Sequence, residues 1–245
     1  MLNKLSLLIF SSSAFAQASS VELNGSTQYL TKSSAIVGAY PWSMFTWFNS
    51  DDATTNSQTF FQIINDSNNH FQFKAAPDQP NTPLRMFISQ SGPGSSGSNT
   101  TTDFTADTWY NAIQVSTSST NRELWLNNGG YIQSTSNISP GSWSATHCGA
   151  SNFGGFTQFM NGELAASTIW DVALSSDDRS RLAARIHPFW IKRSNIQVLL
   201  HFNNSSALGD DLSSNGNDFT PTNSPTAGTI APVRVPQNFA TLGVM

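Results

Sequence analysis

The sequence predicts an all-β fold with a single short helix, and three features lead to this prediction. Most apolar residues occur in short runs that alternate with polar residues or are rich in aromatic rings. Gly, Pro, Asn and Ser clusters separate these runs, as expected for turns. Helix signals are confined to one segment near 175–186. Aromatic residues make up 11% of the 245 residues, enough to predict a packed core.

The composition limits the classes of partner. Charged residues make up only 11% of the chain, about a third of the residues are Ser, Thr or Asn, and the net charge is −4. Because there is no basic cluster, we expect no nucleic-acid partner. No apolar run reaches the length of a membrane span. A single cysteine, Cys148, excludes an internal disulfide and a cysteine-based zinc site, and we expect it to be a buried apolar residue.

Residues 1–18 carry two alternative interpretations. One Lys, an apolar run over 5–10 and two overlapping Ala-x-Ala sites (14–16 and 16–18) are typical of a secretory signal peptide. The same segment is also compatible with a retained N-terminal arm that contacts neighbouring subunits in a larger particle.

The N-terminal half of the remaining chain predicts strands joined by tight turns. An Asn-Gly turn divides the segment 20–30 into two strands, and a polar loop over 65–69 joins a hairpin. The Gly- and Ser-rich segment 91–102 lacks any periodicity and is predicted to be a flexible loop. The strands expected here are 20–30 (in two parts), 42–48, 60–64, 70–74 and 84–89.

The C-terminal half continues this pattern and contains the predicted helix. Ser175 with Asp178 three residues later forms a capping-box-like start, Leu182 and Ile186 supply an apolar stripe, and Pro188 ends the helix. Pro232 and Pro236 argue against a central strand in the last segment. The strands expected here are 107–115, 123–126, 142–149, 157–160, 163–170, 189–191 and 197–202. We therefore expect an N-terminal arm or signal over 1–18, one sandwich over 19–224 and a Pro-rich tail over 225–245.

Several motifs, in order along the chain, resemble those of laminin-G-like domains. They are LNGSTQYL (23–30), the Trp109 strand followed by the Asn-Gly turn at 128–129, WDVALSSDDRSRL (170–182), PFWIKRSNIQVLLHF (188–202) and DLSSNGNDFTPTN (211–223). This resemblance implies a concanavalin-A-like (laminin-G-like) antiparallel β-sandwich jelly roll with one short helix near 175–186. The pattern is most similar to that of phage virion structural proteins carrying this domain.

Catalytic residues are not expected. Glucanases of this superfamily place carboxylates in an E-x-D-x-x-E strand, and retaining hydrolysis requires two carboxylates close together. None of Glu22, Glu123 and Glu163 has acidic neighbours in that arrangement. His147 and Cys148 are adjacent in a predicted strand and point to opposite faces, so they cannot act as a catalytic pair. The sequence therefore predicts a non-enzymatic protein.

Two candidate binding sites remain. A sugar site needs an aromatic platform beside amide or carboxylate groups, which Trp143, Asn152, Phe153 and Phe156 supply. The alternative is that these rings fill the core or a subunit interface. A calcium site is the second candidate, with Asp66, Asn68 and Asn69 as oxygen ligands, although Asx turns at a polar hairpin tip explain the same residues. No other cofactor is expected.

The sequence leaves two functions open. The first is a virion surface protein (a capsid decoration, head-fibre or tail-associated module) whose partners are other virion proteins such as the major capsid protein. Host surface glycans are additional partners under this hypothesis, and a homo-oligomer is expected. The alternative is a carbohydrate-binding or adhesion module of a bacterium, secreted by means of an N-terminal signal peptide.

Overall fold

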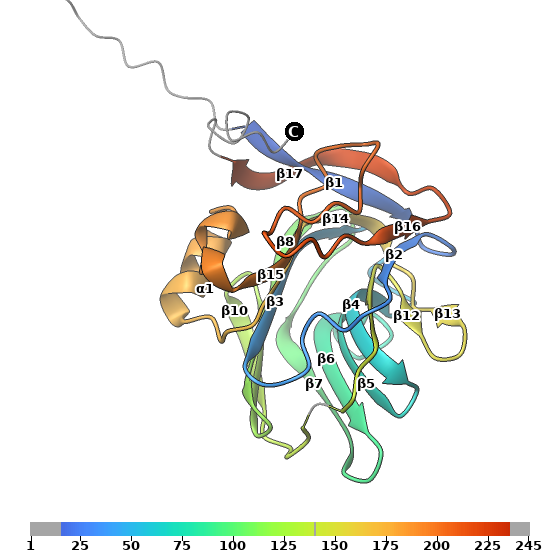
Figure 1. The fold of residues 1–245 in the computed structure, drawn as a ribbon, viewed down its shortest axis with the longest axis vertical. Coiled ribbons are helices and arrows are strands. Elements are labelled where there is room, and N and C mark those ends of the chain that lie inside the picture. Colours follow the sequence, from blue (N-terminus) through green and yellow to red (C-terminus); the bar gives the residue numbers. More distant parts are fainter. Residues whose placement is uncertain (1–15, 140, 236–245) are drawn as a thin grey trace, which may run out of the picture.

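Two antiparallel β-sheets stack face to face and form a sandwich (Figure 1). The structure, a computed structural model, describes residues 16–139 and 141–235. One helix lies outside the first sheet and a small hairpin lies on the opposite side, outside the second sheet (Figure 1). The predicted all-β sandwich with a single short α-helix is therefore confirmed for this part of the chain.

The first sheet has eight strands in the order β10-β9-β8-β3-β14-β1-β17, with β15 also paired to β14. Its central strand β3 buries both faces, because one face meets the second sheet and the other meets the helical layer. The strands are β1 (Ala16–Asn24), β3 (Trp42–Ser50), β8 (Trp109–Ser118), β9 (Asn121–Leu126), β10 (Gly129–Ser134), β14 (Asn161–Trp170), β15 (Ile196–Leu200) and β17 (Thr226–Val235).

The second sheet has seven strands in the order β16-β2-β11-β4-β5-β6-β7. A separate two-stranded hairpin, β12 (Ser151–Asn152) with β13 (Phe156–Thr157), follows β11 in the chain. The seven strands are β2 (Tyr29–Lys32), β4 (Gln58–Asp66), β5 (Asn69–Ala75), β6 (Pro83–Gln90), β7 (Gly94–Asp103), β11 (Ala145–Cys148) and β16 (Thr220–Thr222).

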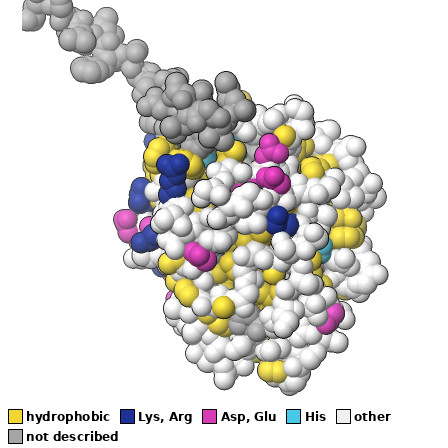
Figure 2. Space-filling model, in the orientation of Figure 1, with side chains coloured by type: hydrophobic (Ala, Val, Ile, Leu, Met, Phe, Trp, Pro, Cys, Tyr) yellow, Lys and Arg dark blue, Asp and Glu magenta, His cyan; other side chains and the backbone are white. Residues whose placement is uncertain are grey.

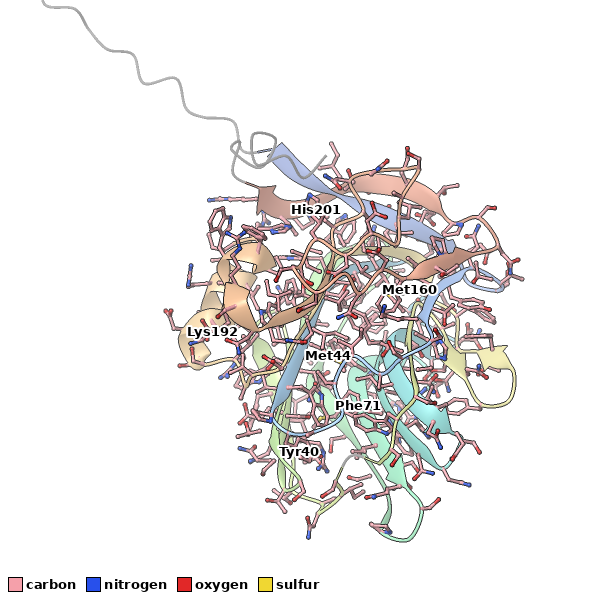
Figure 3. All side chains as sticks on the ribbon, viewed as in Figure 1. Tyr40, Met44, Phe71, Met160, Lys192 and His201 are labelled. Carbon is pink, nitrogen blue, oxygen red and sulfur yellow. The ribbon has the colours of Figure 1, made fainter. Side chains whose placement is uncertain are left out.

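Two apolar layers hold the molecule together. The main layer lies between the sheets and includes Met44, Phe71 and Met160, which Figure 3 shows in the interior. Cys148 is fully buried in this layer, as expected, and burial raises the pKa of its thiol. The second layer lies between the eight-stranded sheet and the helical segment, where Leu182 packs against residues such as Phe45.

The helix α1 (Ser176–Ala183) begins with the predicted capping box. The Asp178 backbone N–H donates to Ser175 Oγ at 3.2 Å, and the Ser175 N–H donates to Asp178 Oδ2 at 3.0 Å. The strand predicted over 189–191 is wrong: this segment is the 3-10 helix η1 (Pro188–Trp190), because the His187 side chain accepts the Phe189 N–H. A second 3-10 turn, η2 (Arg193–Asn195), leads into β15.

The segment predicted to be a flexible loop, 91–102, is mostly strand β7. Gly92 and Gly94 adopt positive φ angles of 98° and 94° and form the turn from β6. The following residues pair in register with β6, for example Gly97 with Phe87. Periodicity was missing because β7 is an edge strand whose small polar side chains mostly face solvent.

The sandwich also extends beyond both expected boundaries. Strand β1 begins at Ala16, and β17 (Thr226–Val235) pairs with β1 at the sheet edge, so part of the expected tail belongs to the domain. Pro232 is compatible with this edge position. Glu163 holds β17 against β1, because its carboxylate accepts hydrogen bonds from Ser20 Oγ and from the Thr229 N–H (2.8 Å) and Oγ1 (2.7 Å). Residues 1–15 and 236–245 lie outside the described part of the chain.

The surface is largely uncharged, as the composition predicted. Figure 2 shows one face dominated by uncharged polar groups, with Lys and Arg gathered mainly on the side where α1 lies. Within residues 16–139 and 141–235, no helix has the length and hydropathy needed to cross a membrane.

Candidate functional site

A row of polar and aromatic side chains crosses the outer face of the seven-stranded sheet. Thr31, His147, Gln62, Gln72 and Phe87 are register partners on β2, β11, β4, β5 and β6. Side chains alternate between the faces of a strand, so this row faces away from the core. The next row points inward and is buried at Leu30, Cys148, Phe61, Phe73 and Met86.

The β12–β13 hairpin lies over this row, and the side-chain amides of Gln62 and Gln72 hold it in place. Gln62 Oε1 accepts the Asn152 N–H at 2.7 Å, and Gln72 Nε2 donates to Ser151 Oγ at 2.6 Å and to Gln158 Oε1 at 2.7 Å. Both glutamines are almost completely buried. The hairpin is therefore held at a fixed position over the sheet.

Aromatic contacts fix the rings of the hairpin. Phe156 stacks on Tyr29 with ring centroids 3.8 Å apart and meets His147 edge-on at 5.0 Å. Phe153, at the hairpin tip, contacts the edge of His70 at 4.9 Å. His70 in turn stacks on Phe87 at 5.5 Å, which continues the aromatic row across β5 and β6.

A pocket of about 420 Å³ lies between this hairpin and the β4–β5 turn. It combines an aromatic ring, Phe153, with a carboxylate, Asp66, and the amide residue Asn152. The lining residues are Ile64, Asn65, Asp66, Ser67, Ala145, His147, Asn152, Phe153 and Gly154. Residues predicted for two separate sites therefore meet in one, which we call the hairpin pocket.

The other two aromatic candidates are placed elsewhere. Trp143 is half-buried and meets Trp42 edge-on at 5.6 Å, where it packs against the main apolar layer. Phe156 belongs to the hairpin but is not among the pocket-lining residues. The structure therefore brings Asn152 and Phe153 together at the pocket and leaves Trp143 in the packing role that was the alternative interpretation.

The histidines beside the hairpin are neutral at physiological pH. Burial lowers the pKa of His147 and of His70 from 6.5 to about 4. His147 Nδ1 lies 2.9 Å from Thr31 Oγ1. A neutral imidazole presents one donor and one acceptor nitrogen, which suits recognition of hydroxyl groups.

Asp66 is surrounded by hydrogen-bond donors. Its carboxylate accepts the Asn68 N–H at 2.8 Å and the Asn69 and Asn65 side-chain amides at 3.0 Å each. These bonds lower the pKa of Asp66. The amides present N–H groups to the carboxylate, which is the Asx-turn arrangement, whereas calcium requires oxygen ligands. In the described residues, no group of three or more His, Cys, Asp or Glu side chains is arranged to hold a metal ion.

Calcium addition tests the metal prediction for Asp66, Asn68 and Asn69. We expect millimolar calcium or chelator to leave the melting temperature unchanged, because the Asp66 oxygens already accept protein donors. Differential scanning calorimetry measures this, with Asp66→Asn as the control. A calcium-dependent rise that is lost in Asp66→Asn would establish a metal site in this turn.

Among the residues that line the hairpin pocket, Asp66 is the one with a carboxylate.

A pair of carboxylates lies on the other sheet, where Glu22 and Glu163 are cross-strand partners on β1 and β14. Sequence spacing missed this pair because its members are far apart in the chain. Burial and the Asp51 and Glu163 charges raise the pKa of Glu22 to about 6. Glu163 is occupied by its Ser20 and Thr229 donors, so it has a structural role at β17.

The sequence also missed a buried histidine pair. His187 Nε2 lies 2.9 Å from His201 Nδ1, and the Phe189 N–H donates to His187 Nδ1. The neutral His187 therefore carries its proton on Nε2 and donates it to His201. His201 also lines a pocket of about 690 Å³, together with Asp210, Asp211 and Asp218. Asp211 accepts the backbone N–H of Leu199 on β15 and of Ser213, and Asp218 accepts the Asp211 N–H.

Comparison with known proteins identifies the family. The sequence model of the concanavalin A-like lectin/glucanases superfamily matches residues 24–178. The chain therefore belongs to this superfamily. None of the curated proteins matches the chain.

Solved structures share the fold at low sequence identity. A putative carbohydrate binding protein from Bacteroides ovatus has a TM-score of 0.64 and 10% identity, over 90% of this chain and 62% of that chain. The CBM40 of the Ruminococcus gnavus IT-sialidase, bound to α2,3 sialyllactose, gives 0.55 and 8%, over 69% and 100%. The enzymatically active domain of the bacteriophage CBA120 tailspike protein 2 gives 0.53 and 12%, over 73% and 29%.

Proposed function

We propose that this protein is a non-catalytic glycan-binding β-sandwich whose ligand occupies the hairpin pocket. The observation that carries the proposal is the convergence of Phe153 with Asp66, Asn65, Asn152 and His147 around one cavity. Its volume, about 420 Å³, is in the range of small-molecule sites.

The chemistry of the lining matches a sugar ring. A pyranose has an apolar C–H face that packs on an aromatic ring, here Phe153, and equatorial hydroxyls that need donors and acceptors. Asn65, Asn152 and the neutral His147 supply both, and Asp66 supplies an acceptor. The carbohydrate-binding neighbours in Bacteroides ovatus and Ruminococcus gnavus support the proposal through their shared fold.

Loss of the Phe153 ring tests this proposal. A glycan array identifies a ligand, and calorimetry then compares wild type with Phe153→Ala. We expect binding to weaken about fivefold or more, because removal of a stacking ring costs on the order of 1 kcal/mol or more. The control is Tyr131→Ala on β10 of the other sheet, where Tyr131 is 39% exposed, and its affinity should be unchanged. Absence of binding to every glycan on the array would overturn the proposal.

A virion component is our second proposal, and it specifies where such a module would be displayed. Ala16 and Val235 are register partners on β1 and β17, so both ends of the described chain lie at one edge of the sandwich. Attachment there leaves the β12–β13 hairpin, on another side of the molecule, accessible (Figure 1). The fold shared with the phage tailspike domain and the resemblance to phage structural proteins support this proposal.

Mass spectrometry of washed particles distinguishes the virion from a secreted module. A virion component remains with the particle and retains residues 1–18. A secreted module is found in the medium with its N-terminus near Gln17 or Ser19. The major capsid protein as a partner and a homo-oligomeric state remain part of the virion proposal.

A further inference from the structure

Two cations lie directly opposite one another on the outer face of the seven-stranded sheet. Lys74 on β5 and Arg85 on β6 are register partners, and Arg85 is two positions from the half-buried Phe87. Like charges directly opposite one another destabilise a sheet. This pair therefore has no evident benefit for folding, although the chain contains only 11 Lys and Arg residues in all.

Neither cation forms an ion pair within the described residues. Lys74 is 6% exposed and donates to Gln158 Oε1 at 3.2 Å. Arg85 makes no side-chain hydrogen bond to the described residues, and its Nε is buried without a partner. The Asp78 carboxylate favours the Lys74 charge from a distance, but it accepts its hydrogen bonds from Ser57 (2.6 Å) and Gln79. The carboxylate that acts on Lys74 is thus already engaged by other donors, and neither cation has an ion-pair partner among the described residues.

The position of the Arg85 guanidinium depends on a glycine. A Cβ on Gly97 would lie 2.6 Å from Arg85 Nη2 and 3.1 Å from Phe87, so only glycine leaves this space on β7. The guanidinium carbon also lies 5.5 Å from the Phe87 ring centroid. A half-buried arginine placed beside an aromatic ring presents a preorganised fork for a carboxylate or sulfate.

Burial and the neighbouring Arg85 lower the pKa of Lys74 from 10.5 to about 8. The protonated amine is therefore held in an unfavourable environment in the unliganded protein. An anion bound beside Arg85 and Lys74 would stabilise the protonated amine and raise the pKa of Lys74 again. The destabilised charge is thus consistent with a group retained for binding.

We propose that Arg85 and Lys74 form a second subsite that binds the carboxylate or sulfate of an acidic glycan. The subsite is joined to the hairpin pocket by the row Phe153, His70 and Phe87. This inference rests on the proposed glycan-binding function and adds the class of ligand. Phe87 packs against the sugar that bears the anion, and the Arg85 fork binds the anion itself.

Matched oligosaccharide pairs test the subsite. Each pair has the same backbone with and without the acidic group, in one arm a uronic or sialic acid carboxylate and in the other an O-sulfate. We expect the acidic member of at least one arm to bind about tenfold or more tightly, because charge-assisted bidentate contacts are strong. The two arms distinguish carboxylate from sulfate recognition.

Variants assign the preference to the two cations. Arg85→Gln is expected to abolish the difference between acidic and neutral ligands while neutral binding remains. Lys74→Met is expected to weaken acidic binding without lowering the melting temperature, an outcome that a purely structural role would not produce. The matched control is Lys192→Met on the other side of the molecule, with a side chain that is 46% exposed.

The outcomes separate the two proposals. Equal affinity for acidic and neutral members in both arms, with Phe153→Ala still weakening both, overturns the acidic subsite and leaves the glycan function standing. Absence of binding to every pair overturns both. Loss of neutral and acidic binding together with a lowered melting temperature in Arg85→Gln and Lys74→Met also overturns the subsite, because it identifies a structural role.

Discussion

Replacement of Arg122 by Met is expected to lower the free energy of unfolding by about 3–5 kcal/mol, because it leaves several buried acceptors without their hydrogen-bond donor. Arg122 is 1% exposed and its guanidinium donates to Tyr40 Oη at 3.2 Å, Ser134 Oγ at 3.1 Å and the Ser136 carbonyl at 2.8 Å. It also donates to the carbonyls of Ser119 and Ile138.

These contacts tie the segment after β10 to the β8–β9 turn. Methionine fills part of the space but leaves the acceptors without donors, which costs stability for each buried carbonyl. The guanidinium has no carboxylate partner among the described residues, so it acts through hydrogen bonds to the backbone and hydroxyls.

Urea unfolding at neutral pH measures the loss in Arg122→Met. The control is Arg181→Met, because Arg181 is exposed on α1 and its side chain makes a single hydrogen bond within the described residues, to the Trp190 carbonyl at 3.4 Å. We expect the control to change stability by less than about 0.5 kcal/mol, as usual for surface positions. An Arg122→Met variant as stable as this control would show that the hydrogen-bond network does not organise the segment.

Acidification is expected to produce the second large effect, a loss of stability as the pH falls from about 6.5 to about 4. Burial lowers the pKa of His70, His147 and His201 to about 4, and that of His187 well below 6.5. In this window the unfolded chain binds protons that the folded chain does not, so stability rises with pH. The shift of His201 alone corresponds to about 3 kcal/mol at one pKa unit per 1.4 kcal/mol.

Glu22 opposes this trend. Its raised pKa, about 6, means that the folded protein takes up a proton before the unfolded chain does, which adds stability as the pH falls from 6 to 4.5. The raised pKa of Asp51 acts in the same direction. Four buried imidazoles with larger shifts outweigh these two carboxyls, so the net effect of acid remains destabilising.

Denaturant titrations at pH 7.5, 5.5 and 4.0 measure this dependence. His201→Gln serves as the matched variant, and we expect a shallower pH dependence because one of the four lowered pKa values is absent. A free energy of unfolding that stays constant or increases as the pH falls from 6.5 to 4 would contradict the assignment of neutral, buried histidines.

The helix start and most strands with an apolar pattern were predicted correctly, whereas two edge strands were not. The α1 start at Ser175 and Asp178 was readable because a capping box lies within four residues. Strands β7 and β17 were missed because both lie at sheet edges. Their backbones pair with β6 and β1, but the side chains of β7 show no apolar alternation, and β17 has only the short alternation at Ala231 and Val233, interrupted by Pro232.

The sequence predicted individual members of the hairpin pocket but not that they lie together. Asn152, Phe153 and Asp66 were each selected for their chemistry, but only the pairing of β11 with β4 brings the two turns together. Trp143 was selected by the same reasoning, but it is half-buried and packs against the main apolar layer, because the exposure of an aromatic residue is a property of the folded chain. The Lys74–Arg85 pair could not be predicted, because it depends on the β5–β6 register.

The central claim is that glycans bind on the outer face of the seven-stranded sheet at the hairpin pocket. An NMR titration of the labelled protein with a glycan identified on the array tests it most directly. We predict that the largest amide shifts occur at residues 64–67 and 152–154, around Asp66 and Phe153. Shifts centred instead on the Asp210–Asp211 pocket, or on the α1 side of the other sheet, would contradict the account.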